Sequence, residues 1–188
     1  MKIFVGGVNG SGKTTIVNQF LVGNSQYQSE NSKSFSSWLG FGGDYEKLRA
    51  LTSEDRDKKL SQFAFEILNK HNNLLFDFHY LNIVRGVITK TTGPWLKNFD
   101  ALFLISTNFD ILWQRILADE RDRALFAEGI ETEEAKNILK NYKDQYKTEF
   151  LNLAKEYNLP HFEIENYDLK ESVDRFTSLI KNLEQNIG

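Results

Sequence analysis

The sequence contains no cysteine and only two prolines among its 188 residues. The absence of cysteine excludes disulfide bonds and zinc sites built on thiolates. No run of apolar residues approaches the roughly 20 that a membrane-spanning helix needs, and the apolar stretch at the start is too short for a signal peptide. We therefore expect a cytoplasmic protein without membrane contact, and the scarcity of proline indicates much regular secondary structure.

The chain also lacks an excess of positive charge. Its net charge is −3 at pH 7, whereas proteins that bind nucleic acids broadly are usually basic. Hydrophobic residues make up 40% and charged residues 26% of the sequence, which are ordinary values for folded proteins. The composition therefore predicts one folded domain of ordinary size, without a broad nucleic-acid surface.

Short apolar runs alternate with helical patterns along the chain. Five strands are predicted, at 2–6, 35–39, 73–78, 101–106 and 161–165, of which 2–6, 73–78 and 101–106 are expected to be buried. The polar segment 23–43 is expected to be a mobile loop that leads into the second of these strands, the segment 80–98 fits no single pattern, and the spacing of apolar residues over 53–70 predicts an amphipathic helix. Strands that alternate with helices are typical of an α/β fold in which a parallel sheet is covered on both faces.

A glycine-rich motif follows the first predicted strand. Residues 7–14 read Gly-Val-Asn-Gly-Ser-Gly-Lys-Thr and match the pattern G-x-x-x-x-G-K-[ST] of phosphate-binding loops, or P-loops. Glycines let the backbone turn closely and aim N–H groups at phosphates, and the helix that follows adds the positive charge of its N-terminus. The nucleotide-binding residues predicted here are Asn9, Gly10, Ser11, Gly12, Lys13, Thr14 and Thr15.

Two of these side chains have specific predicted partners. The Lys13 ammonium is expected on the β- and γ-phosphates of ATP, and the Thr14 hydroxyl on Mg²⁺. P-loop proteins also need a carboxylate at the end of a neighbouring strand to hold the metal, directly or through water. Asp77 ends the apolar run at 73–78, so it is the predicted second metal ligand, ahead of Asp100 and Asp110, which fit turn or helix-cap positions. His79 points to the same side as Asp77, and it either contacts a phosphate or a metal-bound water or is an inert surface or core histidine.

An arginine cluster late in the chain distinguishes among P-loop proteins. The guanine-binding pattern N-K-x-D and the switch pattern D-x-x-G of GTPases are absent. Arg115, Arg121 and Arg123 lie instead within a charged segment of weak periodicity. Such a run is either a solvated helix end or a lid whose guanidinium groups close over a transferring phosphoryl group. The lid is the interpretation we favour, because phosphoryl transfer requires cations around several equatorial oxygens.

Taken together, these segments resemble the adenylate and nucleoside-monophosphate kinase family, particularly the archaeal-type adenylate kinases. The resemblance rests on MKIFVGGVNGSGKTT, Gly43-Asp44, Glu54-Asp55-Arg56-Asp57, Asp77-Phe78-His79, Arg115, Arg121-Asp122-Arg123 and FEIEN at 162–166. It implies a three-layer P-loop NTPase fold with a five-stranded parallel sheet. It also implies that residues 1–188 form one kinase domain, with an acceptor-binding region at about 40–70 and a lid at about 119–130.

The resemblance also implies roles for individual residues. Lys13, Arg121 and Arg123 would stabilise the transferring phosphoryl group. Arg56 would bind the acceptor phosphate, with Asp44, His79 and Arg85 as further substrate-binding residues, and Asn166 would frame the adenine ring. The segment after His79 departs from the glycine-proline loop of the family. The family usually has two arginines near the acceptor site, whereas here Lys58 and Lys59 follow Arg56, and Arg49 and Arg85 are other possible partners.

The predicted function is Mg²⁺-dependent transfer of the γ-phosphoryl group of ATP to a nucleoside monophosphate, with AMP as the first candidate. The expected partners are ATP, ADP and a small phosphorylated acceptor. Two alternatives keep the ATP-binding site and differ in the acceptor of the phosphoryl group. One is an adenylate-kinase-like ATPase that acts as an assembly factor, and the other is a kinase of another small metabolite.

Overall fold

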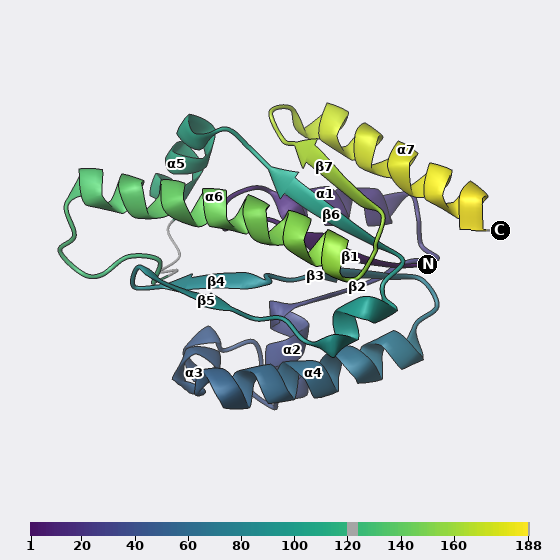
Figure 1. Ribbon diagram of the computed structural model, residues 1–188, viewed down its shortest axis with the longest axis horizontal. Helices are drawn as coiled ribbons and strands as arrows, with labels where there is room; N and C mark the ends of the chain where they lie inside the picture. Colours follow the sequence, from purple (N-terminus) through teal and green to yellow (C-terminus); the bar gives the residue numbers. More distant parts are fainter. Residues whose placement is uncertain (120–123, 188) are drawn as a thin grey trace.

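The computed structural model describes residues 1–119 and 124–187 (Figure 1). The elements follow in the order β1 (Lys2–Gly6), α1 (Lys13–Val22), β2 (Gln28–Asn31), α2 (Ser32–Trp38), α3 (Tyr45–Ala50), α4 (Ser53–Lys70), β3 (Leu74–Asp77), β4 (Leu81–Val84), β5 (Val87–Lys90), the 3-10 helix η1 (Pro94–Asn98), β6 (Ala101–Ser106), α5 (Phe109–Leu117), α6 (Thr132–Glu156), β7 (His161–Glu165) and α7 (Leu169–Ile187). None of the described helices combines the length and hydrophobicity that crossing a bilayer requires.

Five of the strands form one parallel sheet in the order β2-β3-β1-β6-β7. The central strand β1 pairs with β3 on one side, where Val5 lies opposite Asp77, and with β6 on the other, where Gly6 lies opposite Leu104. Because all five strands run the same way, their carboxyl ends share one edge of the sheet. The P-loop and Asp77 therefore meet at that edge, as the sequence predicted.

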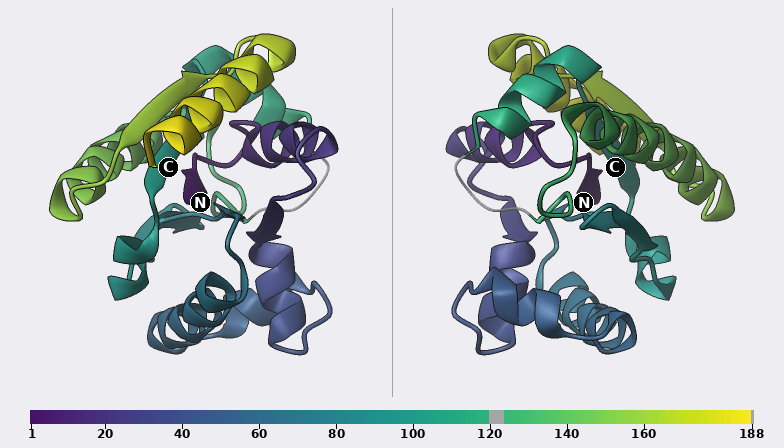
Figure 2. Two further views of the ribbon diagram at one scale, coloured as in Figure 1. Left: turned by 90° about the vertical axis from the view of Figure 1, so that its right-hand side faces the viewer. Right: turned by 90° about the vertical axis from the view of Figure 1, so that its left-hand side faces the viewer.

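Apolar side chains cover both faces of the sheet. Along β1 the side chains alternate: Ile3 and Val5 join one core with residues of α1 and α7, whereas Phe4 joins another with residues of α4, η1 and α6. Figure 2 shows α4 with α2 and α3 on one side of the molecule, and α1 with α7 on the other. This arrangement confirms the predicted α/β fold with helices on both faces of a five-stranded parallel sheet.

The prediction for segment 23–43 is wrong in its secondary structure. The second strand lies earlier, at β2, and residues 32–38 form the helix α2 instead of a strand. Asn31 starts the helix, because its side chain accepts hydrogen bonds from the backbone N–H groups of Lys33 and Ser34 and the Ser34 side chain bonds back to the Asn31 N–H. Phe35 then packs on Phe63 of α4, with ring centroids 5.4 Å apart, so tertiary packing stabilises the helix.

The segment 80–98, which fitted no pattern, forms the antiparallel hairpin β4–β5 followed by η1. The hairpin turn consists of Arg85 and Gly86, whose φ angles of +49° and +80° suit a two-residue turn of the I′ type. Their backbone N–H groups donate to the carbonyl oxygens of Ala124 and Leu125, at 2.7 and 2.8 Å. The hairpin turn is therefore tied to the segment that precedes α6.

Candidate active site

The P-loop connects β1 to α1 through three glycines with positive φ, namely Gly7 at +154°, Gly10 at +85° and Gly12 at +91°. Close approach also requires glycine here. A Cβ atom on Gly12 would lie 2.2 Å from Asn166 Nδ2, and one on Gly7 would lie 2.4 Å from the Ile105 carbonyl oxygen. The loop backbone is therefore folded as tightly as a phosphate cradle requires.

Four predicted site residues meet beside this loop. The Thr14 hydroxyl donates a hydrogen bond to Asp77 Oδ2 at 2.5 Å. The Lys13 Nζ atom lies 3.6 Å from Asp77 Oδ1 and 3.4 Å from His79 Nε2. Lys13 and Asp77 are 7% and 4% exposed, so the ion pair is shielded from water and its attraction is strong. The fold thus brings the predicted phosphate-binding lysine and both predicted metal ligands into one group of contacts.

The oxygens of Thr14 and Asp77 fit a magnesium ion in chemical type. Mg²⁺ prefers hydroxyl, carboxylate, phosphate and water oxygens, and it is usually bound by one or two protein oxygens plus substrate phosphates. Among residues 1–119 and 124–187, no group of three or more His, Asp or Glu side chains is arranged to hold a metal. A metal at Thr14 and Asp77 would take its remaining ligands from water and from phosphate oxygens.

Two side chains from distant elements hold the tip of the P-loop. Asn166, which follows β7, donates from Nδ2 to the Ser11 carbonyl oxygen at 2.8 Å. Arg115 of α5 donates from one guanidinium nitrogen to the carbonyl oxygens of Gly10 and Ser11, at 3.4 and 3.3 Å. These donors fix the carbonyl oxygens at the tip of the loop. Sequence reasoning grouped Arg115 with the lid cluster and assigned Asn166 to adenine, and it did not predict these contacts.

Tyr146 of α6 is a further neighbour that sequence reasoning did not assign to the site. Its hydroxyl oxygen accepts a hydrogen bond from the Gly7 backbone N–H at 2.9 Å. In the sequence Tyr146 belongs to the apolar stripe of a helix, and that pattern carries no signal for a contact 139 residues away.

The predicted acceptor-binding residues lie on separate elements. Asp44 caps α3, since its side chain accepts from the N–H groups of Glu46 and Lys47, and Arg85 is exposed in the hairpin turn. In Figure 1, α3, the amino end of α4 and the hairpin turn lie on the left, the side on which β6 ends. In this view the predicted acceptor-binding residues therefore lie towards the side to which β6 points.

Arg56 and Asp57, in the first turns of α4, carry buried polar atoms. Arg56 Nε and Asp57 Oδ1 lie 4.0 Å apart, and neither atom has a hydrogen-bond partner among the described residues. Burial raises the pKa of the Asp57 carboxyl, and the neighbouring Arg56 guanidinium partly opposes this shift.

The predicted lid arginines Arg121 and Arg123 lie outside the described residues.

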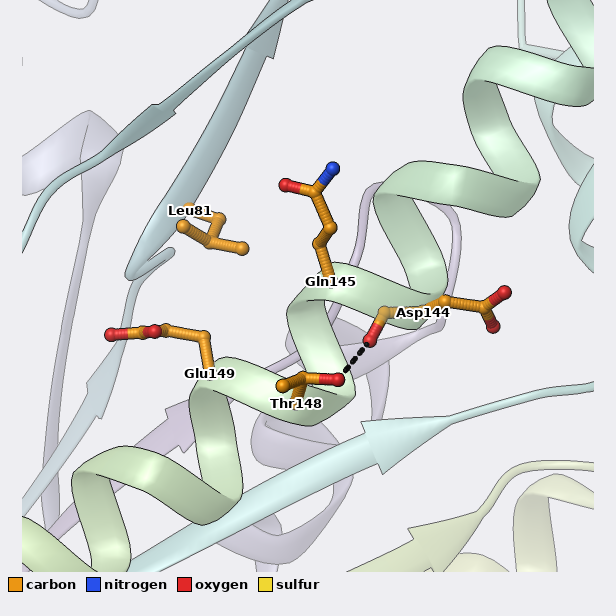
Figure 3. A pocket seen from close by; sticks show the side chains of 5 residues that line it. All are labelled: Leu81, Asp144, Gln145, Thr148 and Glu149. Atoms are coloured by element: carbon orange, nitrogen blue, oxygen red, sulfur yellow. Dashed lines mark hydrogen bonds between the residues drawn. The ribbon is translucent and has the colours of Figure 1, made fainter.

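A surface hollow of about 360 Å³ lies between α6 and β4, lined by Leu81, Asp144, Gln145, Thr148 and Glu149 (Figure 3). Its charged side chains are carboxylates, and the Glu149 carboxylate forms an ion pair with Lys90. Within the hollow, the Thr148 hydroxyl donates to the Asp144 carbonyl oxygen at 3.0 Å. A lining of this charge disfavours phosphate, so the hollow is no alternative to the P-loop as a nucleotide site.

Solved structures with the same architecture include several kinases. Shikimate kinase from Bacteroides thetaiotaomicron has a TM-score of 0.65 and 13% identity, over 96% of this chain and 98% of that one. Deoxyadenosine kinase from M. mycoides has a TM-score of 0.59 and 15% identity, over 96% and 100%, and thymidylate kinase from Candida albicans has 0.57 and 10%, over 97% and 91%. No model of a protein family and no curated protein sequence matches the chain.

The chain shares its fold with these kinases. At identities of 10–15% the similarity extends to the fold alone, and the narrower likeness to archaeal-type adenylate kinases is not supported by these structures. In the P-loop kinase fold of this chain, Lys13, Thr14 and Asp77 form the part of the site that the described contacts define best.

Proposed function

We propose that this chain is a kinase that transfers the γ-phosphoryl group of ATP to a small acceptor in the presence of Mg²⁺. The observation that carries the proposal is the contact group of Lys13, Thr14 and Asp77 beside the P-loop. Phosphoryl transfer needs little covalent participation from the protein and depends on positioning and charge neutralisation. A buried ammonium, two metal-type oxygens and a loop of backbone N–H groups supply both.

Each part of the site has a role in this proposal. The N–H groups of the P-loop bind the phosphates, and Lys13 leaves Asp77 to bind the β- and γ-phosphate oxygens. Thr14 and Asp77 would hold Mg²⁺, which would supply charge neutralisation for the transferring group. Arg121 and Arg123 belong to a lid at about 119–130 that closes over the phosphates and excludes water.

For the acceptor we propose a nucleoside monophosphate, with AMP first, bound by the region 40–70. Thymidylate kinase, named for a nucleoside monophosphate, supports this class. Shikimate kinase and deoxyadenosine kinase, named for acceptors without a phosphate, favour a metabolite with a hydroxyl group as the second candidate. Arg56 distinguishes them in principle, because a guanidinium group whose Nε atom has no hydrogen-bond partner among the described residues suits an acceptor phosphate.

The first test is nucleotide binding. A ligand that binds only the folded state at 100 times its Kd stabilises the protein by about 2.7 kcal/mol, so Mg-ATP should raise the Tm of the wild type clearly. Lys13→Ala should reduce or abolish this shift. A wild type without any shift at millimolar Mg-ATP and Mg-ADP would contradict the proposed donor site.

The second test is turnover with a panel of acceptors. ADP formation is measured with AMP, CMP, UMP, GMP, shikimate, deoxynucleosides and sugars, and in a control without acceptor, with the products separated by chromatography. A new diphosphate, or with AMP the loss of AMP together with formation of two ADP for each ATP consumed, identifies a nucleoside-monophosphate kinase. A new monophosphate identifies a metabolite kinase. Equal ATP loss with and without every acceptor would contradict kinase activity towards this panel and favour the ATPase alternative.

A further inference from the structure

The first P-loop glycine has an unusual hydrogen-bond partner. The pairing of β1 with β6 ends at Gly6, so the next residue, Gly7, lies beyond the sheet ladder. A buried N–H group without a partner is costly, and Gly7 is buried. The Tyr146 hydroxyl oxygen accepts this N–H at 2.9 Å, from a side chain that is 1% exposed. A side chain of α6 therefore replaces the hydrogen bond that the sheet no longer provides.

The glycine before the motif has a steric role in this contact. Gly6 is outside the pattern G-x-x-x-x-G-K-[ST], so phosphate binding does not explain it. A Cβ atom at this position would lie 2.6 Å from Tyr80 Cε1 and 3.3 Å from the Tyr146 hydroxyl oxygen. Glycine at position 6 thus leaves room for both tyrosines against the end of β1.

Tyr146 also contacts the strand end that carries Asp77. Its ring centroid lies 4.0 Å from that of Tyr80, whose hydroxyl donates to the Tyr146 carbonyl oxygen at 3.0 Å. The ring centroids of His79 and Tyr146 lie 6.3 Å apart, and the two rings are perpendicular, with an interplanar angle of 90°. Burial raises the pKa of the Tyr146 phenol, and the hydrogen bond from the Gly7 N–H partly opposes this shift.

We propose that Tyr146 is a positioning residue for nucleotide binding, which fixes the start of the P-loop in its phosphate-binding conformation. A loop that is competent only part of the time binds its ligand more weakly by that fraction. The Gly7–Tyr146 hydrogen bond raises the competent fraction before any phosphate arrives. The inference rests on the proposed function insofar as the P-loop must bind a nucleotide, and it does not depend on the acceptor.

The chain offers a matched control for testing this role. Tyr142 lies one turn earlier on α6, its side chain is equally buried, and its hydroxyl donates to the Leu81 carbonyl oxygen at 2.8 Å. Tyr142→Phe and Tyr146→Phe each remove one buried hydroxyl from the same helix. Only Tyr146→Phe removes a contact with the P-loop.

The experiment measures Kd for Mg-ADP by calorimetric titration, well below the unfolding temperature of each variant, together with stability in urea. We expect both variants to lose stability. A lost hydrogen bond corresponds to a change of about twofold to tenfold in an equilibrium constant, and we expect Tyr146→Phe to weaken Mg-ADP binding within that range. Tyr142→Phe should bind as the wild type does, because a purely structural loss lowers stability without changing the Kd of the folded protein.

Equal Kd values for the wild type and Tyr146→Phe would overturn the inference alone. No binding by the wild type would overturn the proposed function and the inference with it. If Tyr146→Phe fails to fold, amide hydrogen exchange of the wild type without ligand decides the question. The Gly7 amide should exchange much more slowly than the amides of Gly10 and Gly12, and equal exchange rates would overturn the inference.

Discussion

The Thr14 hydroxyl donates a hydrogen bond of 2.5 Å to Asp77 Oδ2, and this contact joins the first turn of α1 to the carboxyl end of β3. The register of β1 and β3 makes this contact possible. Asp77 lies opposite Val5, and the P-loop begins two residues after Val5. A hydroxyl and a carboxylate at this distance present two oxygens to one position. In the proposed function these two oxygens would hold Mg²⁺.

Asp77→Asn should therefore remove most of the Mg²⁺-dependent activity while the protein stays folded. A metal ion at a phosphoryl group contributes several kcal/mol, so we expect a loss of about 100-fold or more. Asp100→Asn is the control, because Asp100 accepts the Lys2 N–H at the opposite end of the sheet. Turnover is measured across a range of Mg²⁺ concentrations for both variants. Equal turnover of Asp77→Asn and the wild type would assign the metal to other ligands.

Asn166→Asp should destabilise the protein and weaken nucleotide binding. The substitution replaces the N–H donor that binds the Ser11 carbonyl oxygen with an oxygen in a site that is 3% exposed. An unsatisfied buried group costs about 1–3 kcal/mol, which urea unfolding can measure. Asn108→Asp is a control of identical chemistry, since Asn108 caps α5 by accepting from Ile111 N–H and aspartate caps helices equally well. Equal losses of stability in the two variants would contradict a specific contribution of the hydrogen bond between Asn166 and the Ser11 carbonyl oxygen.

Arg121→Ala and Arg123→Ala should lower the rate of phosphoryl transfer and leave ATP binding nearly intact. Arginines that stabilise the charge of the transferring group contribute about 10³–10⁵-fold to kcat. The measurement pairs kcat, with the acceptor identified by the panel, with Kd for Mg-ATP. Arg175→Ala, at an exposed position on α7, controls for the loss of a surface charge. If neither substitution changed kcat, the result would contradict the proposal that Arg121 and Arg123 stabilise the transferring phosphoryl group.

Four buried tyrosines should make stability fall steeply in alkaline solution. Burial is the largest cause that raises the pKa of Tyr27, Tyr80, Tyr142 and Tyr146 above the ordinary value of 10.0. In the folded state these phenols therefore keep their protons where unfolded tyrosines ionise. The resulting stability is complete below about pH 10 and is lost as the pH rises beyond it, by up to about 1.4 kcal/mol per pH unit for each tyrosine.

The check on this prediction combines urea unfolding with tyrosinate absorbance over the alkaline range. The four buried phenols should ionise only as the chain unfolds. Tyr142→Phe should reduce the slope of the unfolding free energy against pH by the contribution of one tyrosine, which is up to about 1.4 kcal/mol per pH unit. Ionisation of all seven tyrosines near pH 10 in a chain that remains folded would contradict the prediction.

Local patterns were sufficient for much of the fold. The helix over 53–70 is confirmed to the residue, because its apolar spacing coincides with a Thr52 cap that accepts from the Asp55 N–H. The strands at 101–106 and 161–165 are also confirmed. In the segment 23–43 the pattern was ambiguous, since Phe35 and Trp38 suit a buried strand as well as one face of a short helix. Contact with Phe63, far along the chain, favours the helix.

The sequence by itself determined the P-loop and the acid at the end of β3, because each is a local pattern with a chemical reason. The tertiary structure decided which residues hold the loop. Arg115, Tyr146 and Asn166 reach it across 105, 139 and 155 residues, and each has an ordinary local context in a helix or after a strand. Such contacts depend on how α5, α6 and β7 pack on the sheet, and packing over long separations leaves no periodic signal in the chain.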